Sequence, residues 1–409
     1  MASNRPSTLL LRVDGFGWQD CLATGPGSAI LGSLLFSALF PAPMSVKFLL
    51  RVAGTLLLAW AAAAACVALH TPLPWMLGPL VATSVLSMAG APTESWGPLR
   101  NGGQWAIGAA LGLYFTPEVS ALVGSLWWAI ILGIAWALLL GWGFGAWLYR
   151  LHAPRMHGVP APMLRSTSYF AGAIGAASEM TLLSERENAR TDLVAASHSL
   201  RLLIVTITIP FALQWSGLQG LDNLTPTVRE VSWPGLALLA LLTGAGALVI
   251  DRLGRANPWF MGAMLVSMAV TMAGLHLSAV PQALVNAAQL VIGVSLGVRF
   301  RAEFLHTAPR WLASVAVGTF GLMGICAAFA AVLAWATGLP WVTLLLGTSP
   351  GGITEMAITA KVLQLGVPVV TAFQVCRLIA VLMLVGPMFR RIYPPTEGGS
   401  AISKKNRPL

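Results

Sequence analysis

Long apolar runs, separated by short polar stretches, occupy most of the chain. Many of these runs approach the roughly 20 residues that a helix needs to cross a bilayer. They predict twelve elements, at about 48–69, 73–91, 102–115, 121–149, 168–183, 193–213, 234–250, 258–275, 282–298, 311–337, 341–360 and 367–389. The pattern predicts an all-α polytopic membrane protein.

The same sequence pattern occurs twice. The block from Pro74 to Gly90 resembles the block from Pro258 to Gly274 at one fixed offset. Two further sets of matching residues follow in the same order: Asn101, Gln104, Gly108 and Gly112 with Asn286, Gln289, Gly293 and Gly297, then Gly175, Glu179, Met180 and Arg201 with Gly351, Glu355, Met356 and Arg377. Three ordered blocks indicate an internal duplication, with one membrane repeat at 48–213 and the other at 234–392.

The charges of corresponding loops indicate how the two repeats are oriented. The loop 150–165 carries three arginines, whereas its counterpart at 337–340 is uncharged. The opposite holds at 299–310, which carries three arginines where the first half, at 116–120, has no basic residue. Because basic loops stay on the cytoplasmic side, corresponding loops face opposite sides, and we expect inverted repeats.

Inverted repeats require an odd number of crossings in each half, so one of the six elements must enter and leave on the same side. The short, glycine-bearing segments Ser168–Leu183 and Trp341–Ala360 are the best candidates. The expected topology is about ten transmembrane helices plus two re-entrant elements. The flanking regions are expected to be an N-terminal extension at 1–47, mis-started or disordered, an external linker at 214–233, and a basic cytoplasmic tail at 393–409.

Composition supports a membrane setting and argues against nucleic acid as a partner. The chain is 56% hydrophobic and 9% charged, against about a quarter charged in soluble domains. The net charge of +10 comes mostly from loop residues, as expected from orientation in a membrane. The four cysteines are scattered, and we expect no metal site and no cofactor. The expected partners are the lipid bilayer and a small-molecule or ion substrate, and homo-oligomerisation is left open.

Glutamates at equivalent places in the two re-entrant segments are the main candidates for function. Glu179 and Glu355 lie in apolar, glycine-bearing surroundings, where a carboxylate is costly and by default suggests function. Breaks in the helix, as at Gly351-Gly352, would leave backbone groups free to bind an ion. The hydroxyls of Ser178 and Thr354 would add oxygen ligands. The alternatives are a static buried ion pair and a place at the membrane interface.

Two arginines recur in the helices that follow. Arg201 and Arg377 are each preceded at three residues by another polar side chain, His198 and Gln374 respectively, on the same helix face. We favour pairing of each arginine with a glutamate slightly over direct contact with an anionic substrate. His198 could carry a proton, although a hydrogen-bonded packing role is the more common one for a lone histidine.

A polar stripe with small residues forms a third candidate feature. Asn101 and Gln104 recur as Asn286 and Gln289, each pair followed by two glycines at helical spacing. Such a stripe lets helices approach closely and offers side-chain amides across the contact. We interpret it mainly as a packing seam at the interface between the repeats.

The motifs Pro-Trp-x-x-Gly, Asn-x-x-Gln-x-x-Ile-Gly-x-x-Leu-Gly and Pro-Gly-Gly-x-Thr-Glu-Met resemble the AbrB membrane-protein family. The resemblance covers about 48–392 and implies a duplicated multi-pass domain. This family is distinct from the small soluble DNA-binding regulator of the same name. The first copy departs from the pattern, because Ile174-Gly175-Ala176 stands where the second has Pro350-Gly351-Gly352.

The family's labels imply gene regulation and ammonia oxidation. A monooxygenase needs clustered histidine or carboxylate ligands, and the six histidines form no such cluster in the apolar segments. We therefore predict a protein that is not an enzyme but an ion- or proton-coupled secondary transporter of a small metabolite in the bacterial inner membrane. The alternative is a membrane-located regulator of gene expression.

Overall fold

The computed structural model describes residues 45–156, 158–217, 230–255, 257–300 and 308–394. The chain divides into two compact units, 1–50 and 51–409. Of the first unit, only 45–50, at the start of helix α2, are described. The expectations for the N-terminal extension, and for most of the linker and the basic tail, therefore concern residues outside the described ranges.

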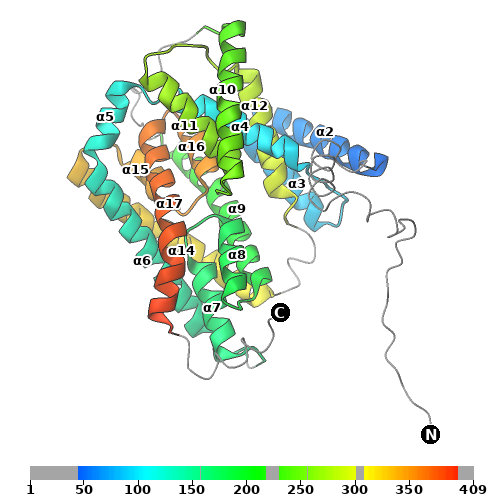
Figure 1. The fold of residues 1–409 in the computed structure, drawn as a ribbon. Helices are drawn as coiled ribbons and strands as arrows, with labels where there is room; N and C mark the ends of the chain where they lie inside the picture. The colour runs from blue at the N-terminus through cyan, green and yellow to red at the C-terminus, as the bar shows by residue number, and fades with distance from the viewer. Residues whose placement is uncertain (1–44, 157, 218–229, 256, 301–307, 395–409) are drawn as a thin grey trace, which may run out of the picture. The chain divides into compact units, whose positions relative to one another are not determined.

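Regular structure in the described ranges is entirely helical, as predicted (Figure 1). The helices of the first half are α2 (Val46–Ala68), α3 (Pro74–Met88), α4 (Gly97–Gly112), α5 (Pro117–Ser125), α6 (Trp127–His152), α7 (Ala161–Gly172), α8 (Ala177–Arg186) and α9 (Thr191–Ser216). Those of the second half are α10 (Trp233–Arg252), α11 (Pro258–Met272), α12 (Gln282–Gly297), α14 (Pro309–Thr337), α15 (Trp341–Thr348), α16 (Ile353–Val362) and α17 (Val367–Ile392).

The predicted single element at 121–149 is wrong at its start. Thr116 caps a separate helix, α5, by accepting a hydrogen bond from the Val119 amide, and Pro117 occupies its first turn. Helix α5 then ends at Ser125, and α6 begins at Trp127. The break follows Gly124-Ser125, which are weak helix formers.

Six described helices are long and apolar enough to cross a membrane. They are α2, α6, α9, α10, α14 and α17. The number rises to seven if α4 and α5, which meet at 90°, form one broken span. The apolar helices α3, α11 and α12 are shorter, at 15 or 16 residues. This composition is that of a polytopic helical membrane protein.

Two groups of helices can be distinguished within residues 51–394. In the first, α4 packs against α10, α11 and α12, and α12 also packs against α3. In the second, α6 packs against α7, α14 and α17, and α9 packs against α7, α8 and α14. Helices α15 and α16 pack against α17 and belong to this second group. In Figure 1, α6, α14 and α17 lie toward the lower left of the view, and α4, α10, α11 and α12 lie in its upper part. We call these the first and the second bundle.

Close helix contacts in the first bundle depend on glycine. A Cβ atom on Gly108 of α4 would collide with the carbonyl oxygen of Phe260 in α11, and one on Gly112 would collide with that of Met264. The Ser267 hydroxyl of α11 donates to the Ala109 carbonyl across the same contact, at 2.7 Å. Glycine therefore lets the two backbones approach to a distance that no larger residue permits.

The corresponding glycines of the second half make the equivalent contact with a helix of the first half. A Cβ on Gly293 of α12 would collide with the Met76 carbonyl oxygen of α3, and one on Gly297 with that of Leu80. Helix α4 of the first half thus packs on α11 of the second, and α12 of the second half packs on α3 of the first. The two halves are interleaved and do not form separate bodies.

Candidate functional site

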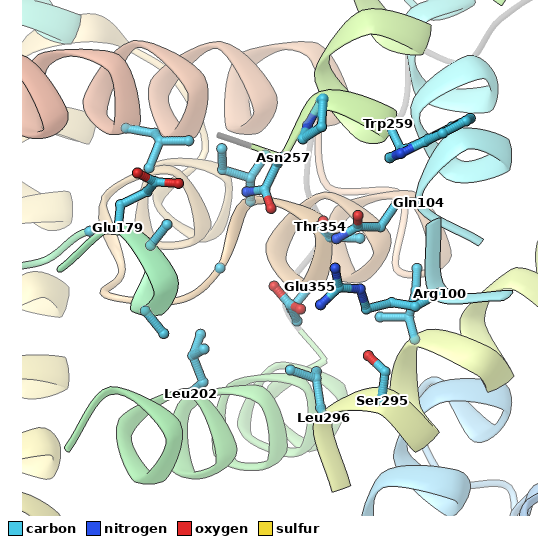
Figure 2. Close-up of a pocket in the computed structure, with 18 of the residues that line it drawn as sticks. Arg100, Gln104, Glu179, Leu202, Asn257, Trp259, Ser295, Leu296, Thr354 and Glu355 are labelled. Carbon is cyan, nitrogen blue, oxygen red and sulfur yellow. The ribbon is translucent and has the colours of Figure 1, made fainter. Parts of the chain in front are cut away.

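A polar cavity of about 490 Å³ lies where elements of both bundles meet. Figure 2 shows side chains converging on it from several helices. The first bundle contributes the start of α4, the end of α12 and the connection between α10 and α11; the second contributes both helix breaks, 174–177 and 351–354, and residues of α9 and α17. A polar cavity in an apolar helical protein is the default candidate for a binding site.

Both predicted re-entrant segments are broken helices. Helices α7 and α8 are separated by an extended stretch, 173–176, and α15 and α16 by 349–352. The residues that bound each break have matching backbone angles: φ is −54° at Ala173 and −60° at Ser349, with ψ of 139° and 149°. In the second break Pro350 removes a backbone donor. Each break leaves helix-end groups near the cavity.

The structure brings both candidate glutamates into this one cavity. Glu355 lies in the first turn of α16 and is 8% exposed, whereas Glu179, in the first turn of α8, is partly exposed. Figure 2 shows the two carboxylates on different sides of the cavity. Thr354 also lines it and is buried. The side chain of Ser178 lies outside the described part of the structure.

Arg201 and Arg377 are buried, and most of their hydrogen bonds go to backbone carbonyls at the two breaks. The Arg201 guanidinium donates to the carbonyl oxygens of residues 171–173, at 2.7 to 3.3 Å. The Arg377 guanidinium donates to Ser349 at 2.5 Å and to Gly351 at 2.9 Å. The expectation that each arginine pairs with a glutamate is therefore wrong for the described residues, because carbonyl groups at helix ends supply the negative charge.

His198 and Gln374 orient these arginines in the same way. His198 Nδ1 lies 2.8 Å from its arginine, and Nε2 lies 2.9 Å from the Phe170 carbonyl oxygen. An arginine can only donate and a carbonyl can only accept, so the imidazole is the neutral tautomer with its proton on Nε2. Gln374 likewise accepts from its arginine and donates to the Leu346 carbonyl, at 2.7 Å. Neither side chain lines the cavity, which favours the packing role of His198 over proton transfer.

The polar stripe divides between two environments. Asn101 and Gln104 line the cavity. Their counterparts do not: Gln289 is buried, and Asn286 is half-buried and accepts a hydrogen bond from Gln282 at 2.9 Å. The corresponding amides of the two halves therefore have different surroundings, although the glycines that follow them make matching contacts.

Several cavity residues were missed by sequence reasoning. Arg100 and Arg299 line it, and Figure 2 shows the Arg100 guanidinium pointing toward Glu355. The Arg100 Nε atom is buried and has no hydrogen-bond partner among the described residues. Asn257 and Trp259, from the start of α11, also line the cavity. The only signal for Arg100 was its place beside the recurring Asn-x-x-Gln motif.

Charges of both signs face the cavity. Its described lining contains four arginines and three acidic residues: Arg100, Arg255, Arg299, Arg377, Glu179, Asp251 and Glu355. In the described part of the chain, no three His, Cys, Asp or Glu side chains gather as metal ligands. The arrangement can hold a small polar or charged molecule between opposing charges.

The fold and the cavity together define a polytopic helical membrane protein with a polar cavity between its helices. The family model described as "Transition state regulatory protein AbrB" matches residues 75–393, and the chain therefore belongs to the AbrB family. A relative from Escherichia coli (strain K12), provisionally named regulator AbrB, is 27% identical over 329 residues, which cover 79% of this chain and 91% of the relative. Uncharacterized protein YhjN of Bacillus subtilis (strain 168) is 24% identical over 346 residues, covering 78% and 87%.

Proposed function

We propose that this protein is a secondary transporter of a small metabolite, coupled to an ion or proton gradient, in the cytoplasmic membrane of a bacterium. The observation that carries the proposal is the single cavity that receives both broken helices and both of their glutamates. Discontinuous helices that meet at a polar site are the arrangement by which many secondary transporters bind substrate and coupling ion.

The pairing of equivalent contacts supports two repeats related by a pseudo-twofold axis, and the charges of the loops favour the inverted arrangement. The contact of Gly108 in the first half with Phe260 in the second has its equivalent in the contact of Gly293 in the second half with Met76 in the first. A pseudo-twofold relation between the halves requires such reciprocal contacts. Helices α3, α4, α11 and α12 are about 22–24 Å long at 1.5 Å per residue. If these four cross a locally thinned bilayer, they and the six long helices make the ten expected crossings. The two helix pairs with breaks are then the re-entrant elements.

The position of the cavity suggests how access alternates. It is bounded on one side by the first bundle and on the other by the second, so a rocking motion of one bundle against the other would open and close it. In the inverted-repeat topology, the α10–α11 connection and the start of α4 lie on the cytoplasmic side with the basic loops. In this topology, the cavity that they line would open toward the cytoplasm.

Uptake into proteoliposomes tests the proposal. Small organic acids and amines are screened under an imposed proton or sodium gradient, using wild type, Glu355→Gln and Glu185→Gln. Glu185 is the matched control, because it lies in α8 but is exposed and outside the cavity lining. Gradient-driven uptake that is lost in Glu355→Gln and kept in Glu185→Gln is the expected result. Absence of flux for every compound, with the protein folded, would contradict it and direct attention to the regulatory role stated in the name of the E. coli relative.

A further inference from the structure

The two helix breaks share one feature that their glutamates do not explain. In each, the carbonyl oxygens that end the first short helix are occupied by an arginine from the next long helix, Arg201 for the first break and Arg377 for the second. Both arginines are almost fully buried, at 2% and 6% exposed. A permanent positive charge therefore lies against the carbonyl oxygens of each break.

Such carbonyls are the groups that bind a coupling cation in carriers with discontinuous helices. The C-terminal end of a helix carries partial negative charge, and unwound backbone beside it coordinates sodium ions. Here the oxygens of Ala173, Ser349 and Gly351 accept hydrogen bonds at 2.7, 2.5 and 2.9 Å. A cation that used these oxygens would have to displace a covalently attached guanidinium, which cannot leave and keeps its proton.

The side chains that hold the arginines make this arrangement rigid. His198 and Gln374 differ chemically, yet each accepts one hydrogen bond from the arginine and stands against a carbonyl oxygen of the preceding short helix, Phe170 or Leu346. Both halves thus have the same arrangement: a buried arginine donates to the backbone carbonyls of the break, and a polar side chain three residues earlier holds the arginine in place. Its repetition argues that the filled carbonyl site is a built feature of the fold.

We infer that Arg201 and Arg377 are tethered cations that fill the two carbonyl sites, so that transport is coupled to protons taken up by the cavity glutamates and not to bound sodium. This inference rests on the proposed transport function and adds the identity of the coupling ion. It also assigns the arginines a role distinct from gripping the substrate.

Glu355 and Glu179 each follow one of the two breaks and line the cavity, as does Asp251 of α10. Charged groups reach the cavity from every side: Arg100 from α4, Arg299 after α12, Arg377 from α17, and Asp251 and Arg255 beside the α10–α11 connection. The Glu355 side chain folds back over Gly352, where a Cβ atom would collide with its carboxylate oxygen. A proton on this carboxyl group changes the charge of the cavity by one unit, which is the change that coupling requires.

A substrate-free measurement tests the filled site directly. The melting temperature of the purified full-length protein in detergent is compared in equal concentrations of sodium, potassium and choline chloride. A ligand that binds only the folded state raises the melting temperature, and sodium at about 100 times the Kd of its site would give a shift of about 3 °C. We expect no sodium-specific shift in wild type; a sodium-specific shift there would overturn the inference.

Variants of the arginine provide the matched comparison. Arg377→Ala empties the carbonyl site and should create a sodium-specific shift, whereas Arg377→Lys keeps a cation and should not. Arg201→Ala gives the same readout at the equivalent break and replaces Arg377→Ala if that variant does not fold. If the emptied sites ignore sodium, the carbonyls are not a cation site and the inference is wrong.

Uptake separates this inference from the proposal on which it rests. Using a compound that the screen shows to be transported, a proton gradient without sodium should drive accumulation, and a sodium gradient at equal pH should not. Accumulation driven by sodium alone would overturn proton coupling and leave the transporter proposal intact. If the screen finds no compound that is taken up under either gradient, the transporter proposal fails, together with the inference that depends on it.

Discussion

Two glycines of α4, six positions apart, should respond in opposite directions to the same small substitution. A Cβ on Gly108 would lie on the carbonyl oxygen of Phe260, a backbone atom that can yield only if α4 moves away from α11. A Cβ on Gly102 would find no atom within 4 Å. The pair therefore isolates the close helix contact from the intrinsic effect of replacing glycine by alanine.

The magnitudes follow from these two environments. Overpacking a tight contact costs about 1–3 kcal/mol, so Gly108→Ala should lower the free energy of unfolding by that amount, less the gain common to both variants. Gly102→Ala should raise it by up to about 1 kcal/mol, because alanine restricts the unfolded backbone. Unfolding by sodium dodecyl sulfate in mixed micelles, followed by fluorescence of the 16 tryptophans, measures the difference. A Gly108→Ala protein as stable as Gly102→Ala would refute the proposed contact between α4 and α11.

Three further predictions concern the support of Arg201, a hydrogen bond between α7 and α17, and the cavity. His198→Gln should retain wild-type stability in the same unfolding assay, because an amide can make both of its hydrogen bonds, whereas His198→Ala should lose about 1–3 kcal/mol by leaving buried groups unpaired. Tyr169→Phe should lose about 0.5–1.5 kcal/mol, because the phenol donates to the Val385 carbonyl at 2.9 Å; an unchanged midpoint would argue against that bond. In a cysteine-free background, a charged maleimide added from the cytoplasmic side should label Asn101→Cys in the cavity but not Asn286→Cys, its counterpart in the second half, and equal labelling would contradict a cavity open to that side.

Helix positions were largely predictable, because long apolar runs leave few alternatives in a membrane. The predicted runs at 258–275 and 282–298 agree with Pro258–Met272 and Gln282–Gly297 within a few residues. The separate helix Pro117–Ser125 was missed, since its nine residues carry a capping signal but too short an apolar run. Helix existence thus followed from hydropathy, whereas a sharp bend between short helices did not.

Parts of the candidate site were harder to predict, for two physical reasons. Backbone carbonyls have no sequence signature, so the partners of Arg201 were sought among carboxylates. The duplication also directed attention to positions that recur, and Arg100 has Val285 at the equivalent place. Trp259 lies in the recurring Pro-Trp-x-x-Gly motif and was not predicted as a site residue, although it lines the cavity. The sequence was therefore least informative about site residues that have no matching residue in the other half.

The interleaving of the two halves has a consequence for biogenesis. Helix α3 is made early, but the surface that it presents to Gly293 and Gly297 stays without its partner until α12 has been synthesised. At about 5–20 residues per second, that delay is on the order of ten seconds or more. The first half must therefore wait in the bilayer, incompletely packed, for the second to insert. Expressed alone, it would be a natural substrate for membrane quality-control proteases, and coexpression of the two halves should rescue both.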